Sequence, residues 1–421
     1  MIKGVKELFN GFKERNGLSI LSATVIGRVL SFFASWIALQ LIDHSKLGVV
    51  IYAFTIVSFI IPIAGLGLHQ SLIRYGALLK TENEKKSLFV YVLKKGMFWS
   101  FILVFITILL SYIFNDFLPE SQFYIIILSF VIPTTFLLEI IKIQFRLYHK
   151  NNLFASADIT YNVLLVIAVS VLSYRYKEIG YAIALVATPL LVSLFFLKTL
   201  RINFSKKIEL TILDFTFWKY GFFASLSNVA TQLLSAIDIL LIGYLITETS
   251  MVTIYKYVAL VPLSLLFLPR VFLTTDFVAI TERIYDKNYI KNYIKNYLLI
   301  FIPISVFIGL LSLAFAKNIL LFFGSDFSSY SSSFTVLIIG ILGILILRGL
   351  FGNLLSAIGK AYINYWIAFS AILLNVVSNY YLIPKYGIFG AALTSAMLMW
   401  LTGIVSCLLF FWMYQNLKKA A

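Results

Sequence analysis

The sequence of 421 residues is 61% hydrophobic and only 12% charged, and its mean hydropathy is +0.95. Soluble domains carry about 25% charged residues, so this composition excludes a soluble globular protein and indicates a polytopic membrane protein. The formal net charge of +16 does not indicate a nucleic-acid partner, because most of the basic residues fall in connecting segments. The single cysteine, Cys407, excludes an internal disulfide framework, and the three histidines show no metal-ligand spacing.

Apolar stretches long enough to cross a bilayer recur along the whole chain, each needing about 20 residues. They predict an all-α fold with twelve transmembrane helices. The predicted spans lie near residues 18–42, 47–69, 88–114, 121–145, 153–173, 179–198, 216–246, 252–280, 293–316, 328–357, 362–383 and 387–414.

The connecting segments give the expected orientation, because cytoplasmic loops are enriched in Lys and Arg. Most of the 34 lysines and arginines lie on the side of the two termini. The other side holds only Lys46, Arg175, Lys177, Lys317 and Lys385. We therefore expect both termini to be cytoplasmic and most of the basic excess to reflect topology.

The chain repeats itself weakly at an offset of about 204–210 residues. The segment LIDHSKLGVVIY at 41–52 is similar to LITETSMVTIY at 245–255, and the pairs Lys150/Lys360 and Gly180/Gly390 share the offset of 210. The similarity predicts two six-helix bundles of parallel topology, residues 1–205 and residues 206–421.

The first helix of each half carries a polar face. Thr24, Arg28 and Ser31 share one face of the first predicted span, and adding 204 to the first two numbers gives Asn228 and Gln232 on the seventh. Within a bilayer such a face is expected to line the bundle interior or a water-filled cavity.

Further charged residues fall within or near the spans. Each has a plain structural alternative, which is an ion pair inside the protein or a long side chain that reaches the headgroups. These residues are Glu139, Lys142, Arg146, Asp158, Asp238, Arg270, Asp276 and Arg348.

Arginine binds phosphate through a planar fork and keeps its charge, so Arg28, Arg270 and Arg348 favour an anionic headgroup attached to an apolar tail. A lipid-linked phosphate or pyrophosphate has this chemistry. An exporter of cationic drugs needs acidic residues to dominate its cavity, whereas here the interior acids are few. Asp238, Asp158 and Glu139 are the candidates to carry a coupling proton.

Two segments give the chain a resemblance to the bacterial polysaccharide repeat-unit (O-antigen or capsule) flippases of the Wzx type. They are LQLIDHSKLGVVIYAFTIVSFIIPIAGLGLHQSLIRYG at 39–76 and YLIPKYGIFGAALTSAMLMW at 381–400. These flippases belong to the multidrug/oligosaccharidyl-lipid/polysaccharide exporter superfamily. Twelve spans over about 420 residues extend the resemblance across the whole chain.

The resemblance implies a MATE-like, V-shaped pair of six-helix bundles around a central cavity in the inner membrane. It also implies alternating-access transport of an undecaprenyl-pyrophosphate-linked glycan, coupled to H+ or Na+, with no other cofactor. Membrane lipid and other polysaccharide-assembly proteins are the further partners to expect. Arg28 and Arg270 occupy regions where the related lipid II flippases carry functional basic residues. The chain has two fewer predicted C-terminal helices than those proteins, which disfavours a peptidoglycan-precursor role.

Two alternatives stay open. One is a MATE-like antiporter for drugs or metabolites, which the basic interior disfavours. The other is a membrane glycan polymerase or ligase, an enzyme that would need a large outer loop bearing catalytic Arg or His. The outer connections predicted here are short, such as ITETSM at 246–251, so we expect a transporter without catalytic residues or a metal site.

Overall fold

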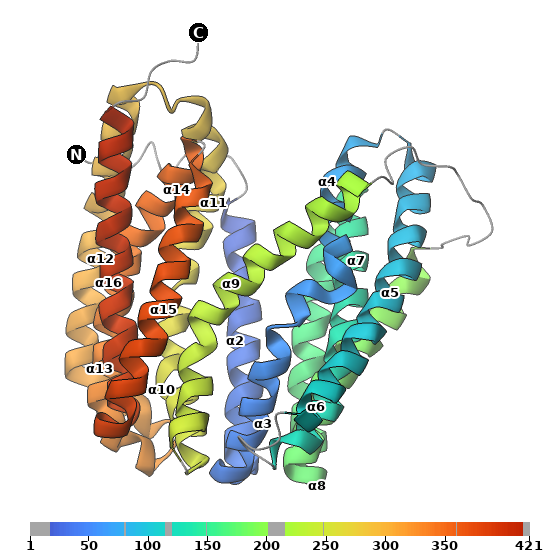
Figure 1. Ribbon diagram of the computed structural model, residues 1–421, viewed down its shortest axis with the longest axis horizontal. Coiled ribbons are helices and arrows are strands. Elements are labelled where there is room, and N and C mark those ends of the chain that lie inside the picture. The colour runs from blue at the N-terminus through green and yellow to red at the C-terminus, as the bar shows by residue number, and fades with distance from the viewer. Residues whose placement is uncertain are drawn as a thin grey trace. The chain divides into compact units, whose positions relative to one another are not determined.

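The protein is described by a computed structural model that covers residues 17–79, 81–113, 120–148, 150–200, 215–246, 248–358 and 360–415. Over these ranges the regular structure is entirely helical, as predicted (Figure 1). The helices before the middle of the chain are α2 (Gly17–Leu41), α3 (His44–Ser58), η1 (Ile61–Gly67), α4 (Leu68–Leu78), α5 (Glu82–Ile113), α6 (Ser121–Ser129), α7 (Val131–Leu147) and α8 (Asn151–Thr199). Those that follow are α9 (Phe215–Leu245), α10 (Ser250–Ser264), α11 (Phe267–Glu282), α12 (Lys287–Leu321), η2 (Ser325–Tyr330), α13 (Ser331–Gly343), η3 (Ile344–Arg348), α14 (Gly349–Ala357), α15 (Ala361–Tyr386) and α16 (Ile388–Gln415).

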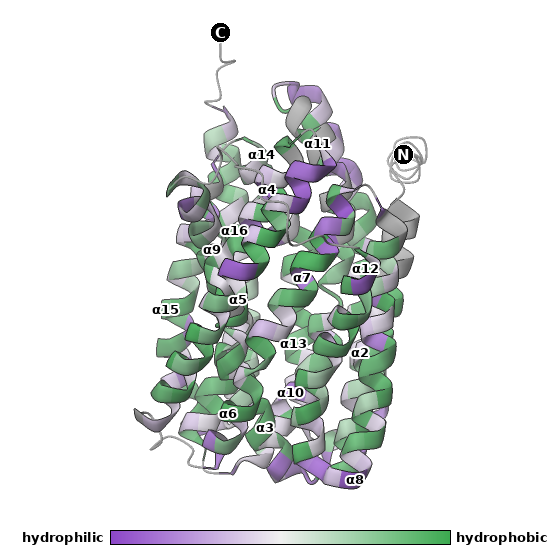
Figure 2. Ribbon diagram, turned by 90° about the vertical axis from the view of Figure 1, so that its right-hand side faces the viewer, coloured by the Kyte–Doolittle hydropathy of each residue, from purple (hydrophilic) through white to green (hydrophobic). Residues whose placement is uncertain are grey.

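Within the described ranges, nine helical segments are long and apolar enough to cross a membrane, and Val25–Leu41 and Ala236–Leu245 are shorter apolar helices. One of the nine, Leu153–Thr199, contains the fifth and sixth predicted spans. The helices therefore account for all twelve predicted stretches. Hydrophobic residues dominate along the helices, and hydrophilic residues gather toward their ends (Figure 2).

The two halves share a hairpin between their last two spans. Helix α8 reverses at Lys177, where φ is +49° and ψ is −127°, and α15 gives way to α16 at Gly387, where φ is +58° and ψ is −141°. A Cβ built on Gly180 would lie 2.0 Å from the Leu172 carbonyl oxygen, and one on Gly390 would lie 2.4 Å from that of Leu382. Each glycine thus lets the second arm of its hairpin pass close to the first.

The same offset of 210 appears in the backbone hydrogen bonds before each hairpin. Lys150 N donates to Phe145 O and Lys360 N donates to Leu355 O, both at 2.9 Å. The internal repeat inferred from the sequence is therefore present in the backbone.

The helices form two compact units. Ile26–Ala236 and Thr247–Thr253 make up the N-terminal unit, whereas Ile237–Ile246 and Ile254–Ala421, with the residues up to Val25, make up the C-terminal unit. The predicted division between residues 205 and 206 lies outside the described residues and stays a prediction.

The N-terminal unit packs tightly around Phe136 of α7. Gly65, with φ +60°, lies at a break inside η1, and a Cβ there would overlap the Phe136 ring. Gly96 of α5 faces the same ring, and its added Cβ would lie 2.1 Å from Phe136 Cζ. The ring therefore occupies space that only two glycines leave open.

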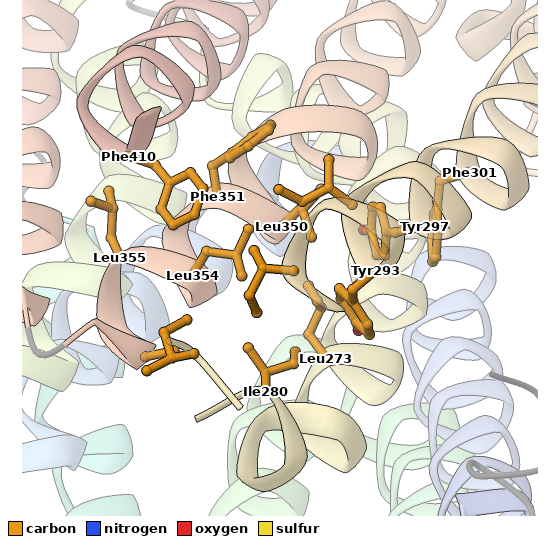
Figure 3. Packing of buried hydrophobic residues seen from close by; sticks show 14 of the residues in the cluster. Leu273, Ile280, Tyr293, Tyr297, Phe301, Leu350, Phe351, Leu354, Leu355 and Phe410 are labelled. Atoms are coloured by element: carbon orange, nitrogen blue, oxygen red, sulfur yellow. The ribbon is translucent and has the colours of Figure 1, made fainter. Parts of the chain in front are cut away.

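The C-terminal unit has its core between α11, α12, α14 and α16 (Figure 3). Tyr297 and Phe301 stack with their ring centroids 4.2 Å apart, and Phe351 packs against Phe410 at 5.7 Å. The Tyr297 hydroxyl donates to Leu345 O at 2.8 Å, so this buried tyrosine satisfies its polar end within the core.

We expect Gly96→Ala to lower the free energy of unfolding by about 1–3 kcal/mol, because its methyl group overlaps the Phe136 ring. The matched control is Gly309→Ala on α12, where the nearest atom to the added Cβ is Leu342 Cδ1 at 3.4 Å. That change is expected to be neutral or slightly stabilising. Thermal unfolding of the two purified variants, monitored as loss of monodispersity on heating, measures the difference. Equal melting temperatures would contradict the packing argument.

Candidate functional site

The polar face of α2 is divided between a packed residue and an exposed one. Ser31 Oγ donates to Asn162 Oδ1 of α8 at 2.7 Å, and Asn162 Nδ2 donates to Asp158 O at 2.8 Å. Arg28, one turn earlier, is exposed and forms no ion pair with any described residue. The side chain of Thr24 lies outside the described residues. An exposed arginine in an apolar helix, with no counter-ion among the described residues, is a candidate to meet an anionic ligand.

An ion-pair triad joins α7 and α8. Lys142 Nζ lies 2.8 Å from Glu139 Oε1 and 2.9 Å from Asp158 Oδ1, and its side chain is 12% exposed. The ring of Phe154 lies 5.5 Å from the same ammonium group. Glu139 and Asp158, two of the three candidates for ion coupling, are thus already engaged by a fixed cation.

Asp238 near the end of α9 has a different environment. Its side chain is buried, and all its described partners are neutral. Oδ1 accepts from Asn375 Nδ2 at 3.0 Å and from Asn379 Nδ2 at 2.7 Å, both on α15. Oδ2 accepts from the Tyr255 hydroxyl of α10 at 2.6 Å and from the Ser395 hydroxyl of α16. Four helices therefore meet at one carboxylate, which we call the Asp238 cluster.

Two further oxygens near this cluster are buried without a described hydrogen-bond partner: Asn379 Oδ1 and Thr394 Oγ1, the latter next to Ser395. Carboxylate, amide and hydroxyl oxygens are the ligands that hard cations prefer. Burying a lone carboxylate in an apolar bundle is costly, and uptake of H+ or Na+ would remove that cost. Among the described residues, no group of three or more His, Cys, Asp or Glu side chains could hold a metal ion.

The beginning of α10 is docked on α3 in the N-terminal unit. Thr253 Oγ1 donates to His44 O at 2.7 Å, and a Cβ on Gly48 would lie 2.1 Å from Thr249 O. Two residues after Thr253, Tyr255 donates to Asp238. Less than one turn of helix thus separates the docked segment from the Asp238 cluster.

The remaining predicted residues are spread over both units. Arg270 is exposed and has electrostatic or hydrogen-bond partners, and Asn228 is exposed on α9. The side chain of Gln232 lies outside the described residues. Arg348 ends η3, and its Nη1 donates to Asn364 Oδ1 at 2.8 Å and to Ser406 Oγ at 2.6 Å.

The structure brings some of these residues together but not all. Arg28, Ser31 and Asn228 belong to the N-terminal unit, and Arg270, Arg348 and Asp238 belong to the C-terminal unit. A single cavity lined by all of them stays a prediction. The sequence analysis missed the four partners of Asp238, although Asn375 and Asn379 are spaced i, i+4 within a predicted apolar span and so share a helix face.

The model of one protein family, described as polysaccharide biosynthesis protein, matches residues 37–332. The chain belongs to this family. A search of the curated proteins finds no match.

Several solved structures of membrane transporters share the fold of this protein. A multidrug resistance MATE family transporter of the MOP superfamily in an inward-facing conformation is 15% identical, with a TM-score of 0.74 over 94% of this chain and 96% of its own. The lipid II flippase MurJ in an inward closed conformation is 19% identical, with a TM-score of 0.62 over 93% and 87%. A MOP superfamily transporter from Pyrococcus furiosus is 17% identical, with a TM-score of 0.68 over 99% of both chains. The protein is accordingly a multi-pass membrane protein with a transporter fold.

We expect Lys142→Met to destabilise the protein, because it leaves Glu139 and Asp158 facing each other without their cation. Adding Glu139→Gln and Asp158→Asn to the same variant removes the repulsion and is expected to restore most of the melting temperature. Thermal unfolding of the wild type, the single variant and the triple variant in detergent measures this. If the triple variant is no more stable than Lys142→Met, the triad does not hold α7 to α8.

Proposed function

We propose that the protein is a flippase that moves undecaprenyl-pyrophosphate-linked oligosaccharide repeat units across the bacterial inner membrane. The observation that carries this proposal is the transporter fold in a member of a polysaccharide biosynthesis family. Repeat units assembled on a polyprenyl carrier are too polar to cross a bilayer unaided. A pathway that assembles such units on one face of the membrane and polymerises them on the other therefore requires a membrane transporter.

The arginines supply the chemistry for the anionic end of such a substrate. Arg28 on α2 is the leading candidate, because it is exposed and forms no ion pair with a described residue. Arg270 and Arg348 are the further candidates to bind the pyrophosphate. Ser31, Thr24, Asn228 and Gln232 offer hydroxyl and amide groups for the sugars. In this proposal the apolar tail stays in the bilayer while the headgroup crosses it within the protein.

The orientation proposed for the chain has both termini in the cytoplasm, which the distribution of Lys and Arg supports. Transport is then from the cytoplasmic to the periplasmic leaflet. Proteins that polymerise the repeat units are the partners expected downstream. A catalytic role has no support in the described helices.

An ion gradient is the proposed source of energy, with Asp238 as the coupling residue and H+ or Na+ as the ion. Its burial and its neutral partners support this choice over Glu139 and Asp158, which form ion pairs with Lys142. Binding of a cation at Asp238 would compete with the hydrogen bonds from Tyr255 and Asn379. The ion would therefore alter the packing of α10 and α15.

A drug antiporter is the second candidate, favoured only by the likeness to multidrug transporters. Cells that lack the protein distinguish the two. A complete lipid-linked repeat unit trapped on the cytoplasmic leaflet, and released when the gene is restored, supports the flippase. Normal lipid pools with increased sensitivity to cationic drugs support the antiporter.

Arg28→Ala is expected to abolish restoration of transport while the protein still inserts into the membrane, because the pyrophosphate loses its counter-ion. Arg28→Lys is expected to retain part of the activity, since it keeps the charge and loses the bidentate fork. The measurement is the amount of lipid-linked oligosaccharide on each leaflet of spheroplasts.

The matched control for Arg28 is Arg175→Ala, an exposed arginine two residues before the Lys177 turn. It is expected to transport normally. Loss of the Arg28→Ala protein from the membrane would instead mean that Arg28 serves the fold.

Asp238→Asn is expected to remove the ion dependence of transport, because an amide carries no charge for a cation to balance. In purified protein, Na+ is expected to raise the melting temperature of the wild type relative to K+ if Na+ is the ion, and Asp238→Asn is expected to abolish the difference. If transport proves proton-driven, the gradient dependence of uptake in vesicles is lost in the same variant. Unchanged ion dependence in Asp238→Asn would reject this residue as the coupling site.

A further inference from the structure

Arg348 is placed by an unusual turn in the C-terminal unit. It is the last residue of η3, a π-helical turn between α13 and α14. Turns of this kind are rare and occur often at functional sites. Helix α16 comes close to this turn at Gly403, where a Cβ would lie 3.0 Å from Leu347 Cβ and 3.3 Å from Arg348 N. The wide turn and the close glycine set the point from which the arginine side chain extends.

The guanidinium is held in one orientation by two neutral acceptors. Its Nη1 donates to Asn364 Oδ1 at 2.8 Å and to Ser406 Oγ at 2.6 Å. Both acceptors are themselves fixed, because Ser406 Oγ donates to Thr402 O at 2.7 Å and Asn364 Nδ2 donates to Gly352 O at 2.7 Å. A side chain positioned in this way has already lost the rotamer freedom that a ligand would otherwise have to remove.

The charge of Arg348 is not balanced by any described carboxylate. Its partners are an amide and a hydroxyl, and no carboxylate among the described residues lies within 4.0 Å of its nitrogens. Both bonds use Nη1, so the edge formed by Nε and Nη2 donates to no described residue. Two parallel N–H groups on this edge form the fork that binds a phosphate or carboxylate oxygen pair.

The helix that carries Asn364 also carries an exposed aromatic face. Tyr365, Trp366 and Phe369 of α15 are 50%, 59% and 42% exposed, and their rings contact one another at centroid distances of 5.6–6.2 Å. Tyr and Trp are enriched where a membrane protein meets the headgroup layer. Because Asn364 directly precedes these residues, an anion next to Arg348 is most simply carried by a lipid.

We propose that Arg348 binds the phosphate of a lipid through its Nε–Nη2 edge, with Asn364 and Ser406 as positioning residues. The shared chemistry is a phosphate ester on an apolar tail. The lipid is either the transported polyprenyl carrier or a resident anionic phospholipid. The first of these assignments rests on the proposed function, and the second does not.

Binding is tested with the purified full-length protein in neutral detergent by native mass spectrometry. The probes are phosphatidylglycerol and undecaprenyl phosphate, each compared with its phosphate-free counterpart, diacylglycerol or undecaprenol. The wild type is expected to retain at least one phosphate lipid about tenfold more strongly than its neutral counterpart. Arg348→Lys is expected to lose most of this preference. Equal retention of the phosphate and neutral lipids, or an unchanged preference in Arg348→Lys, would overturn the proposal.

Two further variants keep the test decisive if Arg348→Lys does not fold. Gly352→Ala places a methyl group 3.3 Å from Nη1, and Ser406→Ala removes one acceptor. Both are expected to weaken phosphate preference without removing the charge. The matched control is Arg283→Lys, an exposed arginine of the same unit whose guanidinium lies 5.1 Å from the Tyr289 ring, and it is expected to bind as the wild type does. Equal weakening in this control would overturn the assignment to Arg348.

Competition separates the two sources of the phosphate. Displacement of phosphatidylglycerol by undecaprenyl phosphate assigns the site to the carrier, and retention of phosphatidylglycerol assigns it to a resident lipid. Failure of the flippase proposal is seen separately, as normal lipid-linked oligosaccharide pools in cells without the protein.

Discussion

The interior of a bilayer offers no hydrogen bonds, and this constraint decides where every polar group of the chain can lie. Many isolated hydroxyls satisfy it within their own helices. Thr55 donates to Ile51 O at 2.8 Å, Thr107 to Leu103 O at 2.7 Å and Thr402 to Leu398 O at 2.8 Å. Such residues need no tertiary partner, so they are free to occur anywhere along a span. Amides are satisfied in this way only in part, since Asn162 Nδ2 donates to Asp158 O in its own helix while its Oδ1 accepts from Ser31 of α2, and several amides and charged groups gather in clusters.

The charged clusters differ in how completely the protein compensates them. Lys142 has two carboxylates, Asp238 has four neutral donors, and Arg348 has two neutral acceptors. An ion pair is closed to a mobile ligand, because a competing ion has to displace a full charge at a distance of 2.8–2.9 Å. Dipoles solvate a charge without cancelling it. This difference underlies the proposals of a cation at Asp238 and an anion at Arg348, whereas Glu139 and Asp158 are occupied by Lys142.

Much of the fold could be predicted from the sequence, because hydrophobic length and loop charge act locally. The offset of 210 was visible in Gly180 and Gly390, and it reappears in the two hairpins because close approach of two helix ends admits only a glycine there. The second partner of Lys142 was not predictable, since Asp158 reaches it only through the packing of α7 on α8. The π-helical turn η3, which carries Arg348, could not be predicted either. The glycine that accommodates it, Gly403, lies on another helix and has no sequence signal of its own.

Helix α10 forms one hydrogen bond with α3 and another with the Asp238 cluster, and the two lie close together along the helix. Thr253 donates a hydrogen bond to the carbonyl oxygen of His44, the first residue of α3, and Tyr255 donates one to the Asp238 carboxylate. A helix is stiff over so short a distance, because its backbone hydrogen bonds fix each residue relative to the next turn. The hydroxyl of Tyr255 cannot follow a change at Asp238 unless its side chain rotates or the start of α10 moves. Since Tyr255 is buried, rotation of its side chain would meet packed neighbours. Displacement of the start of α10 would act directly on the Thr253–His44 hydrogen bond, because the two hydrogen bonds of α10 lie within less than one turn of helix of each other.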